Sequence, residues 1–117
     1  MSRQLLDRTL RAAKRHGAVA CGTPASLTVK AVDGAGAVRL TLDRAHLWFV
    51  QTPQVFRRDW LGHALAQTNG TLAQFTDDAA IVEAAGYPVQ MVEGDPYNLK
   101  VTTKKDLRIV QAILHER

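Results

Sequence analysis

The chain of 117 residues is poor in features that mark secreted or membrane proteins. It has one cysteine, Cys21, so no disulfide can form within it. No apolar run approaches the roughly 20 residues that span a bilayer. Met1–Gln4 leads into a charged stretch and not into the apolar core of a signal peptide. We therefore predict a cytoplasmic, single-domain protein that does not enter a membrane.

Common catalytic motifs are also missing. There is no Gly-x4-Gly-Lys loop and no Gly-x-Gly-x-x-Gly at a strand–helix turn, and Gly34 and Gly36 belong to a turn before a strand. The four histidines lack zinc-ligand spacing. We expect no metal site made by this chain's own residues.

The net charge of +4 is confined to one segment. The first 17 residues carry five basic side chains and one acidic side chain, whereas the other hundred residues are balanced. Basic faces of helices are usually solvated, and this segment has no aromatic residue on which a base could stack. The charge therefore does not indicate nucleic-acid binding.

The first segment has the signals of an amphipathic helix. Ser2 is a suitable N-cap, Gly17 a suitable stop, and the predicted helix runs to about His16. Its predicted apolar stripe consists of Leu6, Leu10 and Ala13.

Apolar runs predict a sheet that is covered on both faces. The candidate strands are Ala18–Thr23, Leu47–Val50 and Val89–Val92. The first of them does not alternate between apolar and polar residues, as is typical of a strand buried on both faces. Pro53 should end the second strand in a loop. With helices between them, these strands predict an α/β fold with mainly parallel strands.

A hairpin interrupts this pattern. Residues 27–32 and 38–42 alternate with period two around a turn at Asp33–Gly36. Because an isolated hairpin is marginal in water, we expect this arm of residues 27–42 to lie on another subunit. Later in the chain, Thr76 is the predicted cap of a helix, and Thr103 with Asp106 has the spacing of a capping box.

Cationic and hydroxyl side chains follow the predicted strands. Arg44 follows the hairpin, Thr52 follows the second buried strand, and Lys100 is predicted to lie in the last short strand. Ligands of open α/β sheets bind at the carboxyl ends of strands. Guanidinium, ammonium and hydroxyl groups bind phosphate, so these residues predict a phosphate site.

The order of several segments resembles the methylerythritol-phosphate cytidylyltransferases. The matching runs are Thr41–Arg44, Gln51–Phe56, Thr76–Ala79, Val92–Gly94 and Asn98–Thr102. The resemblance covers nearly the whole chain and implies a Rossmann-like nucleotidyltransferase sheet with a protruding β-arm that is exchanged in a homodimer. It implies transfer of a cytidylyl group from CTP to methylerythritol phosphate, with Mg²⁺, in non-mevalonate isoprenoid biosynthesis.

The same resemblance implies roles for single residues. Arg44 matches the arginine that positions the acceptor phosphate across the dimer interface, and Lys100 matches the lysine that orients this phosphate near CTP. Thr28, Thr52 and Thr76 match hydroxyl positions of the acceptor pocket. Leu27 departs from the family, which has an aspartate there, so a ribitol-phosphate cytidylyltransferase is an alternative.

The family's Gly-rich loop for CTP and its acidic metal-binding segment have no counterpart in this sequence. We therefore expect residues 1–117 to form the C-terminal part of a single cytidylyltransferase domain, inactive alone, with Mg²⁺ held by CTP and the other part. A non-catalytic dimerisation or phosphate-binding module is the alternative outside the enzyme class.

Overall fold

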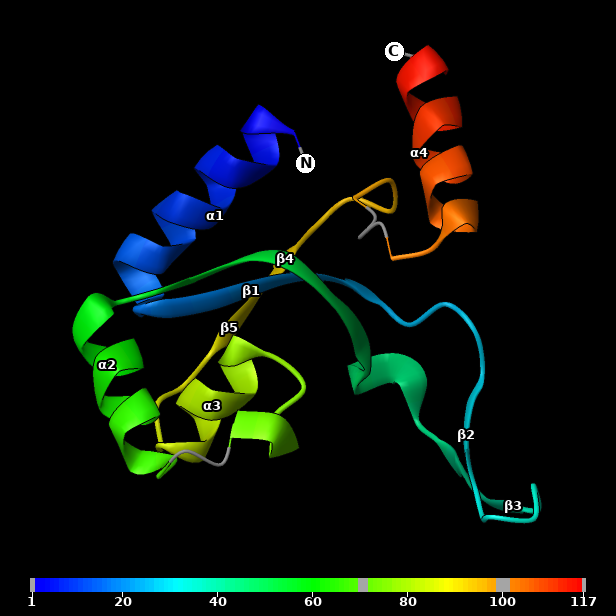
Figure 1. The fold of residues 1–117 in the computed structure, drawn as a ribbon, viewed down its shortest axis with the longest axis horizontal. Helices are drawn as coiled ribbons and strands as arrows, with labels where there is room; N and C mark the ends of the chain where they lie inside the picture. The colour runs from blue at the N-terminus through cyan, green and yellow to red at the C-terminus, as the bar shows by residue number, and fades with distance from the viewer. Residues whose placement is uncertain (1, 70–71, 99–101, 117) are drawn as a thin grey trace.

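The protein is described here by a computed structural model that covers residues 2–69, 72–98 and 102–116. A three-stranded sheet lies at its centre, with α1 on one side and α2 and α3 on the other (Figure 1). The elements in chain order are α1 (Arg3–His16), β1 (Ala18–Pro24), β2 (Val29–Val32), β3 (Val38–Leu42), η1 (Arg44–His46), β4 (Trp48–Phe56), α2 (Arg58–Gln67), η2 (Leu72–Gln74), α3 (Asp78–Ala84), β5 (Gln90–Glu93) and α4 (Lys104–Glu116).

Helix α1 begins and ends where the sequence predicts, but it buries a different face. The Ser2 side chain accepts a hydrogen bond from the Leu5 amide, and Gly17 ends the helix at a φ of 87°. The predicted stripe is wrong, since Leu10 is 43% exposed. The buried residues are Leu5, Thr9 and Ala12.

The sheet is mixed, with strand order β4–β1–β5. Strands β1 and β5 are parallel, as predicted, and α2 and α3 lie between β4 and β5 in the chain. Strands β1 and β4 are antiparallel, so the prediction of mainly parallel strands is wrong for this pair. The chain returns from β1 to β4 through the hairpin without a crossover helix, and a parallel neighbour requires such a crossover.

Strand β1 is covered on both faces, as its apolar sequence predicts. Ala18 packs with Ile81 and Val82 of α3 in the core below the sheet. On the other face, the Cys21 sulfur lies 3.1 Å from the buried Thr9 hydroxyl of α1. Because successive side chains of a strand point to opposite faces, β1 contacts one helix layer on each face of the sheet.

Strand β4 contains an irregularity where a loop was predicted. The strand continues through Pro53. Val50 pairs with Gly22 of β1 and Gln54 pairs with Ala20 of β1, and the residues Gln51–Pro53 between them interrupt the regular pairing. A bulge of this kind redirects side chains. At Gly22, a β-carbon would lie 2.5 Å from the Phe49 carbonyl oxygen, so the close approach of β1 and β4 requires glycine.

Two helix caps position later segments. The cap of α3 is Asp77 and not the predicted Thr76, one residue earlier, because the Asp77 carboxylate accepts a hydrogen bond from the Ala80 amide. The capping box of α4 is confirmed: the Thr103 hydroxyl accepts from the Asp106 amide, and the Asp106 carboxylate accepts from the Thr103 amide.

The stability that the cap of α4 contributes depends on pH. Hydrogen bonds from the Thr102 hydroxyl and amide, and then from Thr103, lower the pKa of Asp106 from its ordinary value of 3.8. Its contribution to stability is therefore present above the unfolded-state pKa and is lost as the pH falls through the lowered folded-state pKa.

The hairpin of β2 and β3 and the helix α4 project from the central body (Figure 1). The Cα radius of gyration is 16.5 Å, against about 13 Å for a compact chain of this length. The hairpin is confirmed, with a turn in which the Asp33 carboxylate accepts from the amides of Ala35 and Ala37. In the parts of the chain that the structure describes, no helix is both long and apolar enough to cross a membrane.

Candidate substrate-binding site

A polar cavity of about 350 Å³ lies where the bulge of β4 faces the start of α3 and the turn after β5. Thr52 and Gln54 line it from β4, Thr76 and Asp77 from the start of α3, and Asn98 from the turn. The structure thus brings together two of the predicted site residues, Thr52 and Thr76, which are 24 positions apart in the sequence. Among the described residues, neither hydroxyl has a hydrogen-bond partner, so both are available to a ligand.

Gln51 joins the bulge to the turn after β5. Its side-chain amide donates to the Asp95 carbonyl at 2.8 Å, and its side-chain oxygen accepts from the Asp95 amide at 3.3 Å. Asp95 in turn organises the next residues, because its carboxylate accepts from the Tyr97 amide and its carbonyl from the Asn98 amide. The Asn98 side chain donates to the Thr52 carbonyl, which closes this wall of the cavity.

Gln54 forms the matching link to α3. Its side-chain amide donates to Asp77 Oδ2 at 3.1 Å, and its oxygen accepts from the Ala79 amide at 3.1 Å. Both half-buried glutamines therefore use both ends of their amide groups, and Thr52 lies between them in the sequence. Sequence analysis assigned no role to either glutamine. The sequence does contain a signal for such a role: the two glutamines lie on both sides of Thr52-Pro53, within a strand that is otherwise mostly apolar.

The other predicted site residues lie elsewhere. Arg44 is exposed at the base of the hairpin, and its guanidinium donates to the Ser26 carbonyl at 2.7 Å and not to Asp43 or Asp95. Thr28 is also exposed, just before β2, and the neighbouring Lys30 donates to the Thr41 hydroxyl. Lys100 lies outside the described residues. Asn98, two positions earlier, lines the cavity.

The described residues do not fit a metal site. They contain no group of three or more His, Cys, Asp or Glu side chains that could hold an ion. The carboxylate in the cavity, Asp77, already accepts from the Ala80 amide through Oδ1 and from Gln54 through Oδ2. It acts as a helix cap, and we derive no step through a metal bound to this chain.

Comparison with known proteins decides the family. A profile of the family described as IspD, 2-C-methyl-D-erythritol 4-phosphate cytidylyltransferase, matches residues 1–116. This chain belongs to that family. A curated relative of this name from Prochlorococcus marinus is 45% identical over 112 residues, which are 94% of this chain and 49% of the relative.

Solved structures agree with the family assignment and with the Rossmann-like nucleotidyltransferase fold. The 2-C-methyl-D-erythritol 4-phosphate cytidylyltransferase of Thermus thermophilus is 37% identical with a TM-score of 0.83, over 97% of this chain and 56% of that one. The 4-diphosphocytidyl-2C-methyl-D-erythritol synthase of Anaerococcus prevotii has a TM-score of 0.85 at 28% identity, over 97% and 53%. The chain spans about half the length of the relatives that it matches.

The link made by Gln51 can be tested at the turn after β5. Replacing Gln51 with leucine should remove hydrogen-exchange protection from the Asp95 amide, since that amide donates to Gln51 Oε1. The Gly94 amide, which donates to the Gly22 carbonyl at 2.7 Å, should stay protected and serves as the internal reference. We expect a loss of stability of about 1 kcal/mol.

Amide exchange followed by NMR measures both sites in one sample. Gln111→Leu, at an exposed position of α4, is the matched control and should change neither amide. Equal protection of Asp95 in the Gln51→Leu variant and the unmodified chain would show that the link does not hold the turn.

Proposed function

We propose that this chain carries the acceptor-binding half of a 2-C-methyl-D-erythritol 4-phosphate cytidylyltransferase and works with a CTP-binding part. The observation that carries the proposal is the cavity in which the unpaired hydroxyls of Thr52 and Thr76 meet beside Asn98. Hydroxyl and amide groups suit the polyol and phosphate of such an acceptor. The relatives' names supply the acceptor identity that the cavity alone does not specify.

The proposed reaction needs positioning more than covalent catalysis. A phosphate oxygen of the acceptor attacks the α-phosphorus of CTP, a new P–O bond forms, and the bond to the bridging oxygen breaks to release pyrophosphate. The nucleophile is already an anion, so no general base is required. The acceptor phosphate and the triphosphate of CTP repel each other, and cations must offset this repulsion as the two groups approach in line.

In this proposal, Lys100 and Arg44 supply those cations. Lys100 follows Asn98 by two residues in the sequence, which supports a place for its ammonium group at the cavity. Arg44 stands at the base of the hairpin, where it donates to the Ser26 carbonyl, and it is not one of the described residues that line the Thr52–Thr76 cavity of its own chain. We propose that Arg44 and Thr28 act at the cavity of a second subunit.

Exposed apolar side chains on the hairpin support this dimer. Val32 and Val38 are each 55% exposed, and Leu40 on β3 is 51% exposed. An arm of two strands that shows such residues to water gains free energy when another subunit covers them. We propose further that Mg²⁺ acts in the reaction when held by CTP and by residues outside this chain.

An assay of pyrophosphate release tests the function. The purified chain is incubated with CTP, Mg²⁺ and methylerythritol phosphate, first alone and then with the N-terminal part of the Prochlorococcus marinus relative. We expect turnover only in the mixture, because this sequence lacks a Gly-rich phosphate loop. Light scattering on the same samples should report a dimer.

Each outcome of the assay has a defined meaning. Turnover with ribitol phosphate in place of methylerythritol phosphate would reassign the acceptor. A folded mixture that is silent with both acceptors would contradict the enzymatic proposal and favour a binding module.

A further inference from the structure

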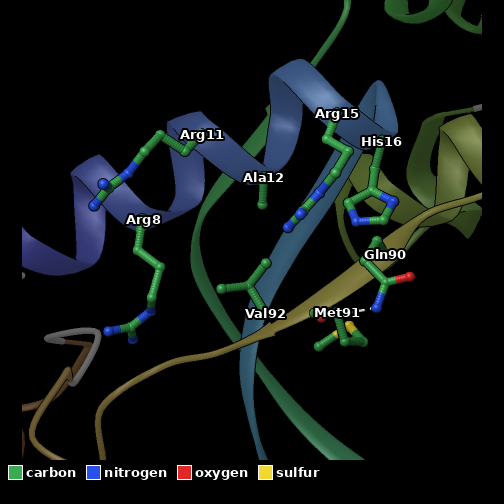
Figure 2. Close-up of a pocket in the computed structure, with 8 residues that line it drawn as sticks. All are labelled: Arg8, Arg11, Ala12, Arg15, His16, Gln90, Met91 and Val92. Carbon is green, nitrogen blue, oxygen red and sulfur yellow. Dashed lines mark hydrogen bonds between the residues drawn. The ribbon is translucent and has the colours of Figure 1, made fainter.

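A second cavity, of about 490 Å³, lies between α1 and the edge strand β5, apart from the Thr52–Thr76 cavity. Arg8, Arg11 and Arg15 line it from α1, where spacings of three and four residues place them on one face. Figure 2 shows Arg8, Arg15 and His16 reaching from the helix toward β5, with Arg11 extending beside Arg8.

Among the residues that the structure describes, no carboxylate forms an ion pair with these guanidinium groups. Arg8 donates to the Glu93 backbone carbonyl, at the end of β5. Arg11 and Arg15 have no hydrogen-bond or ion-pair partner among the described residues. The segment that holds them carries the whole net charge of the chain.

Stabilisation of the helix α1 accounts for only some of these basic residues. Basic residues in the last turn favour the negative end of the helix dipole, which accounts for Arg15 and His16. Arg8 and Arg11 lie further from that end, and cations three or four residues apart on a helix repel each other by about 0.2–0.5 kcal/mol per pair. An anion bound between the arginines would turn this repulsion into attraction.

The cavity has an apolar floor beneath its charged rim. Ala12 is buried on α1, and Val92 of β5 is half-buried across from it, while the Met91 side chain lies on the opposite face of β5. A guanidinium fork matches a phosphate group in two parallel hydrogen bonds. An apolar floor with only a few charged groups around it is typical of sites for small molecules, and the volume is within their usual range.

We propose that the α1–β5 cavity, lined by Arg8, Arg11 and Arg15, binds a small molecule that carries two or more linked phosphates. The phosphates lie between the guanidinium groups, and the rest of the molecule lies on Ala12 and Val92. This site is distinct from the proposed acceptor cavity and does not depend on the proposed function.

Calorimetric titration of the 117-residue chain with pyrophosphate, ADP and orthophosphate tests the proposal. The double variant Arg11→Gln/Arg15→Gln should weaken binding of pyrophosphate and ADP at least about tenfold, since it removes two charged hydrogen-bond donors, each of which typically changes affinity by about that factor or more. Both side chains are exposed, so the fold should persist, and circular dichroism checks it. The control Arg39→Gln/Arg108→Gln has the same net charge and should bind like the unmodified chain.

The source of affinity follows from the comparison of ligands. Orthophosphate should bind more weakly than pyrophosphate, and tighter binding of ADP than of pyrophosphate would assign a role to the apolar floor. Equal losses in the two double variants would show a diffuse charge effect and overturn the proposal. Unchanged pyrophosphate and ADP binding in Arg11→Gln/Arg15→Gln, or no binding by the unmodified chain, would overturn it as well.

Discussion

Replacing Lys100 with alanine is expected to lower kcat/KM for pyrophosphate release at least about 100-fold in the reconstituted enzyme. Removing one donor that stabilises charge in a transition state typically costs about 2.7–4 kcal/mol of barrier. In the proposed reaction, Lys100 brings together two phosphates that repel each other. The loss should therefore appear in kcat as well as in KM, because the interaction strengthens when the new bond forms.

The control for this variant lies four residues further along the chain. Lys104 is exposed at the start of α4, and Lys104→Ala removes the same charge without a predicted contact to substrate. Initial rates at varied concentrations of both substrates separate the two variants. Equal rates for Lys100→Ala and the unmodified protein would remove Lys100 from the mechanism and leave Thr52 and Thr76 as the acceptor site.

The second large effect is expected on stability. Leu5 is 1% exposed on the buried face of α1, so Leu5→Ala should leave a cavity and cost about 2–5 kcal/mol of the free energy of unfolding. In a chain of this size, such a loss lowers the melting temperature by more than about 10 °C. Thermal unfolding followed by circular dichroism measures it.

Leu10→Ala on the same helix is the matched control. Leu10 belongs to the apolar stripe that the sequence predicts, yet it is 43% exposed. Its replacement should therefore cost much less than that of Leu5. If Leu10→Ala destabilises as much as Leu5→Ala, another surface covers the outer face of α1 in solution.

These two leucines show where prediction from sequence ends. The predicted apolar stripe contained Leu10 and not Leu5, because the local pattern does not say which face of a helix meets a sheet. The same limit explains the direction of β4. Its apolar residues predict a strand, whereas the hairpin that precedes it makes the strand antiparallel to β1.

The candidate site divides in the same way. Thr52 and Thr76 could be selected through the resemblance of short segments, and the structure places them in one cavity. The links that shape this cavity were not predicted, because Gln51 and Asp95 are 44 residues apart and Gln54 and Ala79 are 25 apart. The roles of Arg44, Lys100 and Thr28 remain predictions.

Features that depend on contacts within a few residues could be predicted from the sequence. The caps at Ser2 and Gly17, the hairpin turn at Asp33 and the capping box at Asp106 are of this kind, since each is a hydrogen bond or a backbone conformation within one turn. In contrast, the buried face of α1, the direction of β4 and the bulge between Val50 and Gln54 could not be predicted and follow from the packed fold. These features depend on which distant segments share a core, and the free energy of that choice is distributed over the whole chain.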